Sequence, residues 1–313
     1  MLKTVVGSFP PKKLPLEKAT KWAVDLQLNH DLDIVSDGEQ RTDMISYFSS
    51  LPGLGIKSHG PYIKSQILPL EDPKNHAKLE DLRSVKEYLK QKGREDVKVK
   101  VSITGPITLG FACACNGVGY YSGLTDKRLY SDFALALKPL VEEAAKTDCY
   151  VQIDEPSLSI RVMEGSQAVK IVNQTISSLP NSIRDEEKLI VHVCGSLTDS
   201  LFRDLMSLDA PILSLAFSAP KVRANLDVVS KSLLVSNGKK LGLGCVSVQA
   251  NKKEEVESFE QVVQRLEIAR NRLGEERIAL LHPDCGMRPT GEDAVEPILN
   301  LVSSSAKYFE EKK

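Results

Sequence analysis

The sequence lacks the long apolar runs that mark membrane-spanning segments. No stretch of its 313 residues approaches the roughly 18 consecutive apolar residues that a membrane span needs. The opening segment, MLKTVVGSFPPKKLP, holds only a short apolar run that is followed by prolines, which is not the pattern of a secretory signal. These absences favour a cytoplasmic protein that does not insert into a membrane.

A strong net charge and the common nucleotide-binding motifs are also absent. The net charge is -1 and the pI is about 6.6, so the overall balance indicates neither a nucleic acid nor an anionic membrane as a partner. No GxGxxG motif and no P-loop follows the first β-rich run. The chain has six cysteines and no export signal, so we expect free thiols and not a disulfide framework.

What the sequence does have is a regular alternation of short β-rich runs and longer segments with helical periodicity. The predicted strands are residues 4–8, 33–38, 99–105, 150–156, 189–195, 211–217, 241–248 and 278–286. Eight such units predict an α/β protein with a single (β/α)8 TIM barrel over residues 1–313, and an open doubly wound sheet is the alternative. Residues 52–80 form an extended βα segment that is predicted to fold as a hairpin or as a lid over the barrel mouth.

Polar side chains gather at the C-terminal ends of these predicted strands, where barrel enzymes build their active sites. Ser8 ends the first run, Glu39 follows the second, and Asp154 stands at the end of the fourth. Any one of these residues has a plain structural explanation, such as a helix cap. Their coincidence at one end of the barrel predicts a polar site there, with carboxylates that suit the ammonium group of an amino acid.

A second group of strand-end residues has the chemistry of a metal site. His192 and Cys194 stand two positions apart in LIVHVCG, so both side chains point to the same face of a strand, and Cys285 follows the eighth run. One imidazole and two thiolates suit zinc. Three protein ligands leave a fourth position open, which is typical of a catalytic site that activates water or a substrate thiol.

These strand-end motifs, in this order, resemble the cobalamin-independent methionine synthase family. The matching stretches are VGSFP at 6–10, DGEQRTDMISYF at 37–48, GPIT at 105–108, QIDEPSL at 152–158, HVC at 192–194 and PDCG at 283–286. Together they span nearly the whole chain. Full-length members carry an additional N-terminal barrel, and this chain is similar to the catalytic C-terminal barrel alone.

The resemblance implies a methyltransferase that adds a methyl group to the sulfur of homocysteine, held as a thiolate on zinc, to form methionine. The implied zinc ligands are His192, Cys194 and Cys285. The residues implied to bind homocysteine are Val6, Gly7, Ser8, Glu39 and Asp154, the two carboxylates holding its ammonium group. The implied cofactor is therefore zinc and the implied partners are homocysteine and a methyl donor.

The chain also departs from the family pattern at the metal. The family adds a Glu ligand at the end of the sixth strand, and Ala216 stands at that position here. Three interpretations stay open. Water or homocysteine completes the zinc site, Cys113 or Cys115 substitutes for the missing ligand, or the metal is lost.

The residues implied to handle a folate donor depart as well. Ile160 replaces a Glu, and Gln249 replaces the His that acts as proton donor, which leaves the catalytic acid unknown because an amide cannot act as a general acid. We therefore expect a non-folate donor, such as a methyl-corrinoid or a corrinoid protein. The alternatives are a zinc methyltransferase with another thiol acceptor and a non-catalytic paralogue that acts as a binding or regulatory partner.

Overall fold

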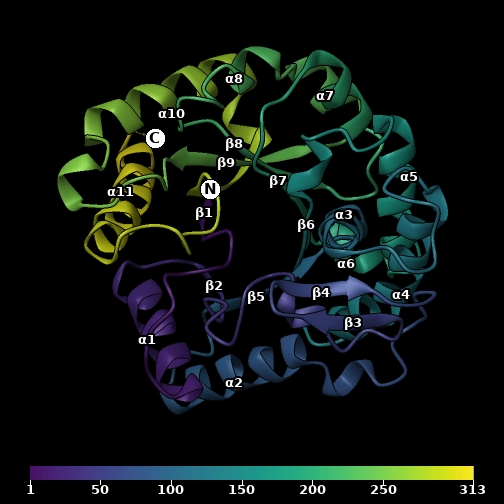
Figure 1. The fold of residues 1–313 in the computed structure, drawn as a ribbon. Helices are drawn as coiled ribbons and strands as arrows, with labels where there is room; N and C mark the ends of the chain where they lie inside the picture. Colours follow the sequence, from purple (N-terminus) through teal and green to yellow (C-terminus); the bar gives the residue numbers. More distant parts are fainter. Residues whose placement is uncertain (313) are drawn as a thin grey trace.

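The computed structural model describes residues 1–312, and it shows eight parallel strands surrounded by helices (Figure 1). The strands lie in the order β1-β10-β9-β8-β7-β6-β5-β2. Their bounds are β1 Leu2–Lys3, β2 Ile34–Val35, β5 Lys98–Thr104, β6 Tyr150–Asp154, β7 Leu189–Val193, β8 Ile212–Ala216, β9 Lys240–Val246 and β10 Ile278–Pro283. This arrangement confirms the predicted TIM barrel and rules out the alternative fold, an open doubly wound sheet.

Helices follow the strands around the outside of the barrel. They are α1 Leu16–Asn29, α2 Ala77–Gln91, α3 Pro106–Asn116, α4 Lys127–Ala145, α5 Gly165–Ile176, α6 Asn181–Asp185, α7 Asp199–Leu205, α8 Asn225–Val228, α9 Lys231–Ser236, α10 Phe259–Leu273 and α11 Glu292–Glu311. Short 3-10 turns are η1 Ser46–Phe48, η2 Pro73–Asn75, η3 Pro156–Leu158, η4 Lys253–Glu255 and η5 Glu275–Arg277. Among residues 1–312, no helix has both the length and the apolar character needed to cross a membrane.

The strands are buried on both faces, as expected for a parallel sheet whose outer face is covered by helices. Every residue of β6, β7 and β8 is buried. The helices contribute apolar faces at helical spacing: α4, for example, buries Phe133, Leu137 and Leu140. The barrel core and the layer between strands and helices therefore hold the strand ends in fixed positions.

The first strand differs from the sequence-based prediction, which placed it at residues 4–8. The strand pairing with β10 involves only Leu2 and Lys3, and the chain then leaves the sheet. Side chains replace the missing strand partner: Ser102 and Gln152 donate hydrogen bonds to the carbonyl oxygen of Val6, at 3.0 and 2.8 Å. The prediction was wrong because a β-rich run also suits an extended loop whose backbone is satisfied by side chains.

The segment 52–80 contains a β-hairpin and the start of α2. Strands β3 Leu54–Lys57 and β4 Gly60–Ile63 pair antiparallel, separately from the barrel sheet. The hairpin lies against α3, where Asn116 Nδ2 donates a hydrogen bond of 2.9 Å to the carbonyl oxygen of Pro61 (Figure 1). The single-domain boundary at 1–313 stays a prediction.

Candidate active site

The three predicted metal ligands come together at the C-terminal end of the barrel. His192 belongs to β7, Cys194 follows that strand, and Cys285 follows β10. Their ligand atoms all lie within 4.8 Å of one another. His192 is buried and both cysteines are half-buried, so a ligand can approach the sulfur atoms from the barrel mouth. This grouping makes the trio a candidate metal site.

The imidazole of His192 has the free nitrogen that a metal site requires. Its Nδ1 lies 2.8 Å from Oγ of Ser214, whereas its Nε2 is buried and has no hydrogen-bond partner among residues 1–312. Buried polar atoms in folded proteins are nearly always paired, and each exception asks for an explanation. A cation held between Nε2 and the two sulfur atoms accounts for this unpaired nitrogen. The residues present therefore fit a metal ion.

The two thiols of the trio are electrostatically coupled. The interaction with Cys285 lowers the pKa of Cys194 below its usual range. The same contact, together with burial, raises the pKa of Cys285 well above its usual range. Two adjacent thiolates repel each other in a poorly solvated site, so in the absence of a cation Cys194 ionises first and Cys285 keeps its proton.

All eight predicted site residues line a single cavity of about 230 Å³ at the barrel mouth. They are Val6, Gly7, Ser8, Glu39, Asp154, His192, Cys194 and Cys285. The metal trio and the two carboxylates thus face the same small space, which suits a small amino acid with a thiol at one end. Their individual roles stay predictions.

Glu39 reaches this cavity from a strained turn after β2. Its φ is +50°, and the preceding Gly38 has a φ of +71°. A side chain at Gly38 would place its Cβ 2.6 Å from the Cβ of Ala23, so only glycine fits there. Non-glycine residues in the left-handed region concentrate at functional sites, where the strain aims a side chain. Here the turn aims a buried carboxylate at the cavity.

Each of the two carboxylates uses one oxygen inside the protein and keeps the other free. Oε1 of Glu39 accepts a hydrogen bond of 2.5 Å from Nζ of Lys78, and Oδ1 of Asp154 accepts one of 2.7 Å from Nε2 of Gln152. Among residues 1–312, no group donates to Oε2 of Glu39 or to Oδ2 of Asp154. These two oxygens are available to an ammonium group.

Burial sets the protonation of Asp154. Loss of solvation raises the pKa of this carboxyl to about 6, although His192 acts in the opposite direction. A bound ammonium ion would favour the charged form. Asp154 is therefore ionised at neutral pH and close to its titration range at mildly acidic pH.

Several residues that shape the site carry no signal in the sequence. Lys78 comes from α2, is 1% exposed, and also lies over the ring of Tyr47 at 3.9 Å. Arg288 lines the cavity and donates to the backbone oxygens of Glu39 and Thr42. Ser214 on β8 is the exception: it stands two positions before Ala216, and the strand period alone places both side chains on one face.

Cys113 and Cys115 do not take the place of the missing metal ligand. Both lie on α3, where Cys113 is fully buried and Cys115 is exposed. The cluster of possible metal ligands within residues 1–312 includes neither of them. Burial raises the pKa of the Cys113 thiol to about 12, which makes it inert at neutral pH. This alternative from the sequence is therefore wrong.

Ala216 and Gln249 line a second cavity that adjoins the metal trio. It has a volume of about 470 Å³ and shares Cys194 and Cys285 with the first cavity. Its other walls are mostly small or apolar, and Lys221 stands on its lining. The alanine itself offers no oxygen ligand on this side of the two sulfur atoms.

Comparisons with known proteins decide the family. The family model described as cobalamin-independent synthase, catalytic domain, matches residues 2–308. The chain belongs to this family. A methionine synthase of Methanothermobacter marburgensis is 29% identical over 98% of this chain and 100% of its own length. A solved B12-independent methionine synthase from Shewanella sp. W3-18-1, in complex with selenomethionine, shares the fold with a TM-score of 0.74 at 18% identity, covering 100% of this chain and 99% of that one.

Membership in the cobalamin-independent synthase family confirms the resemblance and makes the chain a methyltransferase. The expectation of a corrinoid donor gains no support. The relative from Bacillus cytotoxicus, 24% identical over 93% of this chain and 38% of its own length, is named 5-methyltetrahydropteroyltriglutamate--homocysteine methyltransferase. That name gives a folate as donor. The departures at Ile160 and Gln249 led to the wrong expectation about the methyl donor. They show which side chains are missing, but they do not show which other residues bind the donor.

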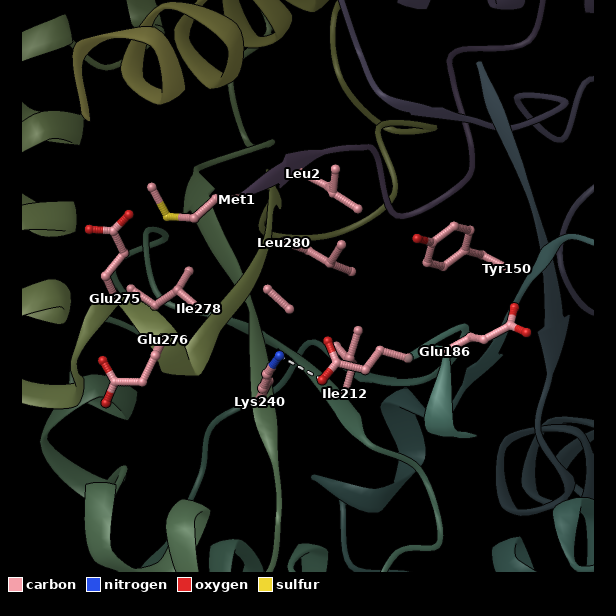
Figure 2. Close-up of a pocket in the computed structure, with 12 residues that line it drawn as sticks. Met1, Leu2, Tyr150, Glu186, Ile212, Lys240, Glu275, Glu276, Ile278 and Leu280 are labelled. Atoms are coloured by element: carbon pink, nitrogen blue, oxygen red, sulfur yellow. Dashed lines mark ion pairs between the residues drawn. The ribbon is translucent and has the colours of Figure 1, made fainter. Parts of the chain in front are cut away.

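A larger hollow lies at the opposite end of the synthase barrel (Figure 2). It has a volume of about 800 Å³ and is lined by residues at the N-terminal ends of the strands, including Leu2, Ile212, Lys240 and Ile278. Its charged lining consists of glutamates and one lysine, and Lys240 is paired with Glu187 at 2.6 Å. No cysteine or histidine lines it. Size alone therefore does not mark the active site.

Proposed function

We propose that this chain transfers a methyl group from a methylated pteroylglutamate to the sulfur of homocysteine and so forms methionine. The observation that carries the proposal is the shared cavity: a soft His/Cys/Cys trio and two carboxylates with free oxygens line the same space of about 230 Å³. A soft metal site suits a thiol and the carboxylates suit an ammonium group. Homocysteine carries both groups on one short chain.

We propose zinc as the metal, held by His192, Cys194 and Cys285. The donor set supports this choice, because one imidazole and two thiolates are ligands that zinc prefers. Bound there, zinc would supply a Lewis acid that keeps a substrate thiol deprotonated at neutral pH. Ala216 contributes no ligand, so the protein leaves room for the substrate sulfur beside the trio.

The chain's own residues bind and orient the amino acid. Glu39 and Asp154 would accept hydrogen bonds from its ammonium group through their free oxygens. Arg288 lines the same cavity and has guanidinium hydrogen atoms beyond those that bind the backbone, which suits the carboxylate of the amino acid. Fixing both ends of the amino acid orients its sulfur for in-line attack on the methyl carbon.

The donor would occupy the adjoining cavity of about 470 Å³, which meets the sulfur atoms of Cys194 and Cys285. The thiolate sulfur attacks the methyl carbon, the bond from that carbon to the pterin nitrogen breaks, and its electron pair stays on the nitrogen. That nitrogen then takes a proton from solvent, because Gln249 is a neutral amide and is exposed at the cavity. Lys221 on the cavity lining suits the anionic glutamate tail of such a donor.

The test measures methionine formation from homocysteine by the zinc-loaded protein, in one arm with 5-methyltetrahydropteroyltriglutamate and in the other with methylcobalamin. We expect product with the pteroylglutamate. Product with methylcobalamin alone would overturn the proposed donor and keep the acceptor. Product with neither donor would overturn the proposed function.

A further inference from the structure

A serine bridges two buried histidines behind the metal trio. Oγ of Ser214 lies 2.8 Å from Nδ1 of His192 and 2.9 Å from Nε2 of His282. Nδ1 of His282 in turn lies 2.7 Å from the carbonyl oxygen of Pro283. All three bridged side chains are at most 2% exposed, so water does not compete for these hydrogen bonds. The chain of bonds runs from a backbone carbonyl to a predicted metal ligand.

The direction of every hydrogen bond in this chain follows from its fixed end. A carbonyl oxygen only accepts, so Nδ1 of His282 must carry the proton that it donates to Pro283. A neutral imidazole with its proton on Nδ1 can only accept at Nε2, so the Ser214 hydroxyl donates to His282. That hydroxyl has one hydrogen, so it accepts from Nδ1 of His192.

His282 must be neutral for these hydrogen-bond directions, and its surroundings favour that state. The ring is buried and no carboxylate forms a hydrogen bond with it among residues 1–312. The neutral ring is therefore the form present at physiological pH.

We propose that Ser214 and His282 are positioning residues that hold His192 in the tautomer with its proton on Nδ1. In this tautomer Nε2 carries a free lone pair, and Nε2 is the ring nitrogen that has no hydrogen-bond partner among residues 1–312. The proposal rests on the proposed function, because it assigns a purpose to a metal ligand. It also explains why Nε2 of His192 has a free lone pair before a metal binds: the hydrogen bond at Nδ1 fixes the tautomer.

The glycine-rich strand β9, which reads LGLGC at residues 241–245, has a part in this arrangement. A Cβ at Gly242 would lie 2.9 Å from Nε2 of His282 and 3.3 Å from Cα of Ser214. The glycine therefore makes room for the histidine inside the barrel. We expect Gly242→Ala to displace the imidazole and to weaken the relay without touching a metal ligand.

The first experiment reads the tautomer directly in zinc-free protein by 15N NMR of the imidazole groups, with His192 assigned through a His192→Gln spectrum. We expect the Nδ1-protonated form of His192 in the parent protein and a shift of population toward the Nε2-protonated form in Ser214→Ala. A parent protein with its His192 proton on Nε2 would overturn the proposal. This reading needs neither metal nor activity, so it stands apart from a failure of the proposed function.

The second experiment measures zinc affinity by competition with a chelator. We expect Ser214→Ala and His282→Phe to lose about 10–100-fold in affinity, the usual cost of removing the hydrogen-bond partner of a metal ligand. Ser214→Thr keeps the hydroxyl and should keep most of the affinity. Ser305→Ala is the matched control, because Ser305 is also fully buried and its hydroxyl has no hydrogen-bond partner within residues 1–312.

Thermal unfolding of the zinc-free variants separates positioning from general structural damage. We expect Ser214→Ala to unfold within a few degrees of the parent protein while its zinc affinity drops. Unchanged zinc affinity in both Ser214→Ala and His282→Phe would overturn the proposal. So would an equal loss of affinity in Ser305→Ala, because that residue lies outside the relay.

Discussion

At the C-terminal ends of the strands lie the imidazole, the thiols and the carboxylates of the small cavity, whereas the N-terminal ends of the same strands frame a larger hollow with glutamates. The carboxyls at the first end are buried: burial raises the pKa of Asp37 and Asp154 to about 6. At the second end Glu276 is exposed, and hydrogen bonds from its own backbone and from Lys231 hold its pKa below the usual range. The carboxyl pKa is thus raised by burial at the first end and lowered at the exposed Glu276, so the two ends differ in the burial of their carboxyl groups as well as in volume.

Removing one thiol at each end of the barrel is expected to give the largest difference in zinc affinity between two variants. Cys285→Ala removes a proposed metal ligand and should lower zinc affinity by more than about 100-fold. Removal of a residue that only hydrogen-bonds a ligand costs at most about 100-fold. Methionine formation should fall with it. Cys149→Ala, a buried cysteine just before β6 at the other end, should keep both and cost about 1 kcal/mol in stability. Zinc content and the rate of methionine formation are measured for both variants. An equal loss of zinc in the two variants would contradict this prediction.

The buried ion pair between Glu39 and Lys78 offers the next test. Glu39→Gln leaves the Lys78 ammonium unpaired, so the free energy of unfolding should fall by about 3 kcal/mol. The KM for homocysteine should rise about tenfold or more through the lost charged hydrogen bond.

The double variant Glu39→Gln/Lys78→Met separates these two effects. It should regain stability and keep the high KM. Glu187→Gln, which breaks the exposed pair with Lys240 at the N-terminal end, should change stability by less than about 1 kcal/mol. A double variant with a normal KM would show that Glu39 only pairs with Lys78 and does not bind homocysteine.

Adding a carboxylate at each end of the barrel should change zinc affinity by a smaller factor. Ala216→Glu introduces an oxygen beside the trio, and we expect zinc affinity to rise about tenfold while homocysteine binds more weakly, because the new ligand competes with the substrate sulfur. Ala279→Glu places the same side chain in the N-terminal hollow and should leave zinc affinity unchanged. Chelator competition and KM values for both variants provide the measurement.

The pH dependence of Asp154 gives the smallest effect. Its pKa is raised from 3.8 to about 6, so homocysteine binding should weaken as the pH falls below about 6 and the carboxylate becomes protonated. The stability that the protonated form contributes is present below about pH 4 and is lost as the pH rises through about 6. Asp154→Asn should remove both dependences, and a KM profile and unfolding curves across this range check them.

The sequence predicted the barrel and the grouping of the site because both depend on short-range patterns. Strand and helix periods set the eight repeats, and the i, i+2 spacing placed His192 and Cys194 on one face. The first strand was misplaced because the loop over residues 4–8 satisfies its backbone with side chains from distant strands. The alternative in which Cys113 or Cys115 supplies the missing ligand is wrong because both lie on α3, outside the cluster of possible ligands, and residue type alone does not place a thiol in a site.

By itself, then, the sequence determined the fold class and the family, and it predicted which residues line the candidate site, since each of these depends on periodicity or on motifs. Only the tertiary structure decided that Lys78 binds Glu39 and that Ser214 joins His192 to His282. These partners are 39, 22 and 68 residues apart. Closure of the barrel brings them within hydrogen-bond distance, and burial keeps water from competing for these hydrogen bonds.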